Sequence, residues 1–115
     1  MKINTAELTG PALDCAVARC EALGTNMLRV HGGAVFIKDC DTLIQCDFST
    51  NWAQGGPIIE RERITVRANQ RNEGWEATKS WIGTGRSGPT PLIAAMRCYV
   101  ASKLGDEVEI PGELA

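Results

Sequence analysis

Residues 90–105 read Thr-Pro-Leu-Ile-Ala-Ala-Met-Arg-Cys-Tyr-Val-Ala-Ser-Lys-Leu-Gly, a stretch that carries the signals of a complete helix. Thr90 is a typical N-cap, and Pro91 suits the first helical position because the N–H that proline lacks has no partner there. Gly105 ends the helix because glycine adopts the left-handed conformation at low cost. We therefore predict a helix that ends at about Leu104. Its apolar side is formed by Leu92, Ala95, Met96, Tyr99, Val100 and Leu104.

A second helix is predicted over about residues 11–23, with Pro11 in its first turn and Gly24 at its end. Apolar residues recur in it at helical spacing, at Leu13, Ala16, Val17 and Cys20. The polar residues Asp14, Arg19 and Glu21 are expected to face outward.

β-prone runs fill much of the space between these helices. Residues 27–31 and 34–38 are joined by Gly32-Gly33, which predicts a hairpin with a primed turn because both central positions require positive φ. Residues 64–67 and 75–81, separated by a polar turn, predict two further strands.

Two segments stay undecided at this level. Residues 42–48 fit a third strand or a short turn of helix, and residues 106–115 fit a tail or a short edge strand. With no alternation of strand and helix, the pattern predicts one α+β domain over residues 1–115, with two helices packed on an antiparallel sheet of four or five strands.

Composition excludes several classes of protein. The 115 residues are 43% hydrophobic and 23% charged, which is typical of one globular domain. No apolar run has the roughly 20 residues that a membrane span needs, and the first residues lack the apolar stretch of a signal peptide, so we expect a cytoplasmic protein.

Cysteine and histidine usage argues against metal and nucleophilic chemistry. The five cysteines are odd in number and form no C-x-x-C pair, so we expect reduced thiols and no metal or cofactor. His31 is the only histidine, which leaves little from which to build a catalytic triad, and no catalytic residue is assigned. We expect a protein that is not an enzyme.

Charge is unevenly distributed along the chain. The formal net charge is -2, which argues against binding of duplex nucleic acid. The segment from Arg61 to Arg97 nevertheless holds seven bases against three acids: Arg61, Arg63, Arg67, Arg71, Lys79, Arg86 and Arg97 against Glu62, Glu73 and Glu76. This imbalance favours a small anionic ligand, with a solvated strand face as the alternative.

Two loops are the candidate binding elements. Residues 49–57 read Ser-Thr-Asn-Trp-Ala-Gln-Gly-Gly-Pro, a loop composition in which Trp52 offers a stacking face. The glycine-rich residues 83–89 could bind phosphate through backbone N–H groups, although a mobile connection is the alternative. Trp81 is assigned to the core. The predicted ligand-binding residues are Trp52, Gln54, Gly55, Gly56, Trp75, Arg86, Ser87 and Thr90.

Three segments, residues 4–14, 49–60 and 89–108, together resemble the NinX family of small proteins from lambdoid and related phages. The resemblance spans nearly the whole chain and implies an accessory phage protein that is made in the host bacterial cytoplasm and is dispensable for building the particle. Small accessory phage proteins of this kind are similar to the sponges that sequester nucleotide second messengers of defence systems such as Thoeris and CBASS.

The leading hypothesis is therefore a homo-oligomer that binds and sequesters a cyclic nucleotide or an ADP-ribose derivative without turnover. One alternative is a protein-binding module that acts on a host or phage replication or defence protein, with Trp52 as its anchor. A second alternative is a nucleotide hydrolase.

Overall fold

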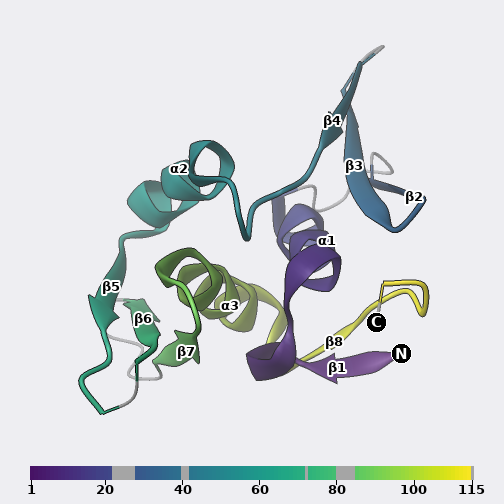
Figure 1. The fold of residues 1–115 in the computed structure, drawn as a ribbon. Coiled ribbons are helices and arrows are strands. Elements are labelled where there is room, and N and C mark those ends of the chain that lie inside the picture. Colours follow the sequence, from purple (N-terminus) through teal and green to yellow (C-terminus); the bar gives the residue numbers. More distant parts are fainter. Residues whose placement is uncertain (22–27, 40–41, 72, 80–84, 115) are drawn as a thin grey trace.

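Helix α3 (Pro91–Leu104) lies at the centre of the molecule and contacts every other helix and two of the sheets (Figure 1). The predicted cap is confirmed at its N-terminal end, and Gly105 follows its last residue with a positive φ but with a ψ of -163°, so it does not adopt the left-handed helical conformation that was predicted. The hydroxyl oxygen of Thr90 accepts a hydrogen bond from the N–H of Ile93 at 3.1 Å, and Gly105 has a φ of 87°. Residues Ala94 to Val100 are all buried, so this helix is buried on more sides than an amphipathic surface helix.

The computed structural model describes residues 1–21, 28–39, 42–71, 73–79 and 85–114. In this part of the chain, the other helices are η1 (Thr5–Glu7), α1 (Gly10–Glu21) and α2 (Trp52–Glu62). The strands are β1 (Lys2–Asn4), β2 (Leu28–His31), β3 (Ala34–Asp39), β4 (Thr42–Gln45), β5 (Ile64–Ala68), β6 (Trp75–Lys79), β7 (Arg86–Gly88) and β8 (Glu107–Glu109).

The strands form three small antiparallel sheets, β1–β8, β2–β3–β4 and β5–β6–β7. The α+β class is confirmed, but the strands do not form the one sheet that was predicted, and the helix count is higher by α2. Strand β7 lies within residues 83–89, for which a mobile connection was the alternative to a binding loop. Strand β8 shows that residues 107–109 form a short edge strand, one of the two alternatives for residues 106–115. Gly24 and Trp81 lie outside the described residues.

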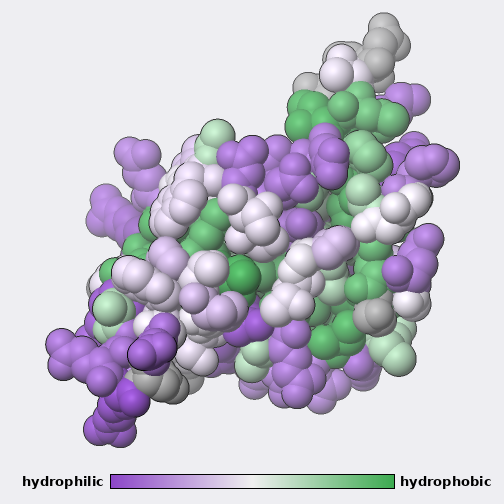
Figure 2. Space-filling view, in the orientation of Figure 1, coloured by the Kyte–Doolittle hydropathy of each residue, from purple (hydrophilic) through white to green (hydrophobic). Residues whose placement is uncertain are grey.

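The hairpin of β2 and β3 forms as predicted. Gly32 and Gly33 have φ values of 60° and 76°, which a primed two-residue turn requires. β4 pairs with β3 and settles residues 42–45 as a strand. This sheet extends beyond α1, and apolar surface gathers over it in Figure 2. Val35 of this sheet is buried and belongs to the hydrophobic core.

Helix α1 confirms the prediction except at one position. Asp14 was expected to face outward but is 5% exposed, and its Oδ1 accepts the N–H of Ser49 at 2.8 Å. Burial raises the pKa of Asp14, and the hydrogen bond from the Ser49 backbone partly opposes that rise. The side chain therefore fixes the segment that leads into α2.

Helix α2 replaces most of the loop that was predicted for residues 49–57. The side chain of Asn51 caps it by accepting the N–H of Ala53 at 2.9 Å. A Cβ at Gly55 would lie 2.5 Å from Leu92 Cδ1, so glycine is what lets α2 approach α3 this closely. The two glycines and Pro57 lower helix propensity, but tertiary packing around the buried Ile58 outweighs that cost.

Candidate functional site

The residues that the sequence selected for ligand binding fall into separate places. Trp52 and Thr90 line one cavity, at the first turns of α2 and α3. Arg86 and Ser87 line another, on the sheet β5–β6–β7. Gln54, Gly55, Gly56 and Trp75 line neither of these cavities.

Gln54 is engaged inside the protein. Its Oε1 accepts the N–H of Asp47 at 2.6 Å, and its Nε2 donates to the carbonyl oxygen of Gln45 at 2.8 Å. Gly55 is buried against Leu92, and Trp75 is half-buried and packs against the core. These three residues therefore make contacts within the protein and do not line either cavity.

Most of the predicted basic segment is neutralised by the fold. Arg61 donates to Glu21 through Nη1 and Nη2, at 3.1 and 2.7 Å, and to Glu62 through Nε, at 3.0 Å. Lys79 donates to Glu62 at 2.8 Å. The hydroxyl of Tyr99 donates to Glu21 at 2.5 Å. These groups join α1, α2, α3 and β6 in one network.

The network shifts the acidity of its members. Hydrogen bonds from Lys79 and then Arg61 lower the pKa of Glu62 to about 2. Burial alone would raise the pKa of Glu21, but hydrogen bonds from Arg61 and Tyr99 hold it below its ordinary value. Burial and the bond to Glu21 raise the pKa of Tyr99. The charges of Arg61 and Lys79 are therefore balanced by those of Glu21 and Glu62 within the network.

Two more bases are engaged elsewhere. Arg86 donates to Asp106 Oδ1 at 2.5 Å. Arg97 is 8% exposed and donates to the carbonyl oxygens of Leu8 and Ser87, each at 2.9 Å. Burial lowers the pKa of Arg97. Its bonds tie η1 and β7 to α3.

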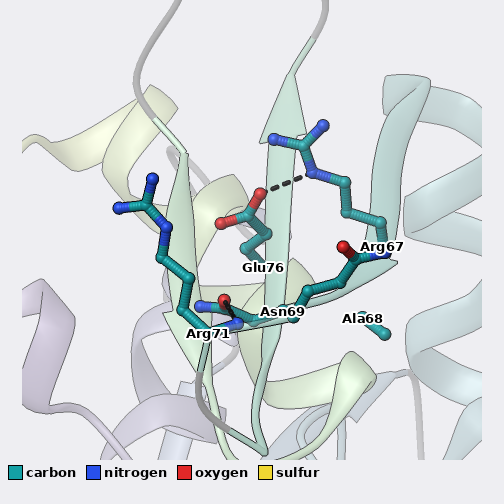
Figure 3. A pocket seen from close by; sticks show the side chains of 6 residues that line it. Arg67, Ala68, Asn69, Arg71 and Glu76 are labelled. Carbon is teal, nitrogen blue, oxygen red and sulfur yellow. Dashed lines mark hydrogen bonds and ion pairs between the residues drawn. The ribbon is translucent and has the colours of Figure 1, made fainter.

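Of the three arginines that remain in the segment, Arg63 ends α2, and the other two lie at the face of the sheet β5–β6–β7 that points away from α3. Arg67 on β5 lies opposite Glu76 on β6, and its Nε donates to Glu76 Oε1 at 2.5 Å. Arg71 lies in the turn between these strands, and its backbone N–H donates to Asn69 Oδ1 at 3.0 Å. Figure 3 shows both guanidinium groups pointing the same way, one on each side of Glu76.

These side chains line a cavity of about 620 Å³, formed by Arg67, Ala68, Asn69, Gln70, Arg71 and Glu76. A second cavity of about 350 Å³ shares Arg67 and Glu76 and extends over Thr78, Gly85, Arg86 and Ser87. We call the two together the arginine groove. Within the described residues, the terminal nitrogens of Arg67 and the guanidinium of Arg71 have no hydrogen-bonding partner, so they are available to a ligand.

Sequence reasoning counted Arg67 and Arg71 in the basic segment but did not select them. A period of two along residues 64–68 could have placed Arg67 on the outer face. Its position opposite Glu76 depends on strand register, which the turn at residues 69–74 sets and which no local signal specified.

The other cavity measures about 210 Å³ and is lined by Ser49, Thr50, Trp52, Thr90, Leu92 and Ile93. We call it the Trp52 pocket. The indole of Trp52 is 54% exposed, so it is the one predicted aromatic residue in the described part of the chain that faces solvent broadly.

Neither a metal site nor a membrane-spanning helix is found among the described residues. They bring no group of three side chains together in a way that could hold a metal ion. Among the helices they form, none is long and apolar enough to cross a membrane.

Comparison with known proteins gives one result. The model of a family described as bacteriophage P22 NinX matches residues 4–103, which is most of the chain and agrees with the resemblance seen in the sequence. No curated protein matches.

Proposed function

The chain belongs to the bacteriophage P22 NinX family. We propose that it is a phage accessory protein that binds and sequesters a nucleotide-derived signal without turnover. The proposal includes action as a homo-oligomer in the host bacterial cytoplasm. Sequestration lowers the free concentration of a ligand by mass action, so it requires tight binding and abundance but no catalytic group.

The arginine groove is the observation that carries this proposal. A phosphoryl group accepts hydrogen bonds from guanidinium groups in a bidentate geometry. Arg67 engages Glu76 through Nε alone, so the contact orients the guanidinium and leaves Nη1 and Nη2 for a ligand. An arginine held in place before binding loses less conformational entropy when the ligand arrives.

The shape of the groove supports a ligand larger than inorganic phosphate. The cavity that contains Arg71 and the cavity that contains Ser87 meet at Arg67 and Glu76. Hydroxyl groups of Thr78 and Ser87 lie in the second cavity, where they could bond ribose or a second phosphoryl group. This arrangement favours a ligand with more than one phosphoryl group, such as a cyclic dinucleotide or an ADP-ribose derivative.

The test incubates the protein with cyclic di- and trinucleotides and cyclic ADP-ribose isomers and then removes unbound ligand. The protein is denatured by heat, and the released material is separated by chromatography. We expect intact ligand to be released only after denaturation. Altered ligand would instead identify a hydrolase, and ligand that stays free throughout would overturn the proposal in favour of the protein-binding module.

Matched variants locate the binding in this assay. Arg67→Gln and Arg71→Gln each remove a positive charge from the groove and are expected to weaken capture on the order of tenfold, which corresponds to about 1.4 kcal/mol. Arg63→Gln removes the same charge at an exposed arginine that does not line the groove, so capture should be unchanged. Equal loss in all three variants would contradict a site at this place.

A further inference from the structure

The Trp52 pocket lies where the first turns of α2 and α3 meet, and it shares no lining residue with the arginine groove. Asn51 caps α2 and Thr90 caps α3, so both helix starts are fixed by side-chain hydrogen bonds. Gly55 holds α2 against Leu92 of α3. Trp52 therefore stands on a rigid support.

Gly56 lies four residues further along α2 than Trp52 and is not among the residues that line the pocket. A Cβ at position 56 would lie 4.0 Å from Trp52 Cε3, so a larger side chain there would contact the indole ring. Glycine costs helix stability at an interior position, and at Gly56 no close packing contact compensates for that cost. The indole beside this glycine is 54% exposed.

The chemistry of the pocket differs from that of the arginine groove. The described residues that line it include no charged side chain; Leu92 and Ile93 provide apolar surface. Thr50 and Thr90 provide hydroxyl groups, whereas the hydroxyl oxygen of Ser49 is buried. The oxygen of Thr90 accepts the N–H of Ile93, which leaves its hydroxyl proton free to be donated to a ligand. Such a lining suits a neutral group that accepts hydrogen bonds.

The size of the pocket narrows the ligand further. Its volume of about 210 Å³ is below the roughly 300 Å³ at the lower end of pockets for drug-sized ligands. A single flat ring system fits this space, whereas a whole nucleotide with its phosphates does not. Without a cation in the lining, nothing in the pocket would neutralise a phosphate.

We propose that the Trp52 pocket binds a neutral, planar heteroaromatic ring of purine size, stacked on the indole, with its ring nitrogens accepting hydrogen bonds from the threonine hydroxyls. Stacking on tryptophan supplies the affinity, because aromatic faces attract one another in offset geometry. The hydroxyl groups select rings that carry acceptor nitrogens over plain hydrocarbons.

The probe is adenosine, which carries the ring without phosphate and so does not depend on the arginine groove. The indole N–H signals of the ¹⁵N-labelled protein are followed by NMR during titration, and the Trp52 signal is identified by its loss in Trp52→Phe. We expect this signal to shift saturably, while the signal lost in Trp75→Phe stays in place. Shifts that fail to saturate or that are equal for both residues would overturn the proposal.

A variant with a larger side chain beside the indole tests whether the ligand stacks on Trp52. Gly56→Leu places a side chain against the indole and raises helix propensity, so the protein is expected to fold while its adenosine affinity falls at least tenfold. Gly112→Leu, at a glycine with nothing within 4 Å of its Cβ position, is the matched control and should bind normally. Unchanged affinity in Trp52→Ala, which removes the indole, would exclude stacking on Trp52.

The two proposals fail separately. Arg67→Gln and Arg71→Gln should leave adenosine binding unchanged, and Gly56→Leu should leave phosphate-dependent capture in the arginine groove unchanged. Loss of adenosine binding in the arginine variants would show that the ring binds in the groove, which would overturn the assignment to the Trp52 pocket.

Discussion

The side-chain amide of Gln54 donates to the carbonyl oxygen of Gln45 across 2.8 Å, which joins the first turn of α2 to the last residue of β4. The oxygen of the same amide accepts the N–H of Asp47 at 2.6 Å. One side chain thus satisfies two backbone groups just where β4 ends, as a neighbouring strand would.

Gln54→Ala is expected to destabilise the protein by about 1–3 kcal/mol, because each lost hydrogen bond contributes about 0.5–1.5 kcal/mol and partly buried backbone groups lose their partners. Urea unfolding followed by circular dichroism measures the change. Gln70→Ala, at an exposed residue of the β5–β6 turn, is the control. A change below about 0.5 kcal/mol in Gln54→Ala would argue against this role.

Alanine substitutions at the two adjacent glycines of α2 should change the stability of the protein in opposite directions. Gly55→Ala puts a Cβ 2.5 Å from Leu92 Cδ1 and 2.7 Å from the Phe48 carbonyl oxygen, so we expect a loss of about 1–3 kcal/mol through overpacking. Gly56→Ala meets only Trp52 at 4.0 Å and should gain up to about 1 kcal/mol from helix propensity. Thermal unfolding of both variants decides this, and the same sign for both would contradict the packing of α2 on α3.

Acid stability should depend on Glu62. Its pKa is lowered from 4.5 to about 2 in the folded protein, so the unfolded state binds the proton first as the pH falls. The stabilisation is present above pH 4.5 and is lost as the pH approaches 2. Glu62→Gln should be less stable at neutral pH and show a shallower decline in acid.

Urea midpoints measured between pH 7 and pH 2 test this dependence. Glu73→Gln, at an exposed glutamate of the β5–β6 turn, serves as the control and should keep the wild-type decline. Parallel curves for the wild type and Glu62→Gln would show that the network of Arg61, Glu62 and Lys79 does not govern acid unfolding.

Thiol labelling should report unfolding. Cys15, Cys20, Cys46 and Cys98 are buried and free, and burial raises the pKa of Cys20 and of Cys46 to about 11. Cys40 lies outside the described residues, so the experiment uses a Cys40→Ser variant in which only the four buried thiols can react. We expect these thiols to react with a disulfide reagent at pH 8 only as fast as unfolding exposes them. Labelling should accelerate with urea in parallel with unfolding, and rapid native labelling would contradict their burial.

Local signals were enough to predict α1, α3 and the β2–β3 hairpin. Thr90, Pro91 and Gly105 act within one helix, and Gly32-Gly33 acts within one turn, so their effect is visible in the sequence. Helix α2 could not be predicted in this way. Its glycines and Pro57 are poor helix formers, and the contact of Gly55 with Leu92 joins residues that are distant in sequence.

The candidate sites depend on the same distant contacts. The basic segment was visible as a count of charges, but only strand register places Arg67 opposite Glu76 and only folding commits Arg61 and Lys79 to Glu62. The outward position predicted for Asp14 was wrong because helical spacing does not indicate that Ser49 lies against it. Trp52 and Thr90 were selected separately, and α2 brings them to one cavity.

The sheet β2–β3–β4 reaches the body of the protein chiefly through contacts of β3 with α1, while α3 is enclosed by the other elements. From this arrangement we expect the sheet β2–β3–β4 to have a lower local stability than the part of the protein built around α3. We expect backbone amide protons of β2 and β4 to exchange with solvent through openings that leave α3 folded, and those of α3 to exchange only through global unfolding. Gln54 of α2 bonds to the end of β4, so we expect its hydrogen bonds to limit local unfolding of the sheet β2–β3–β4.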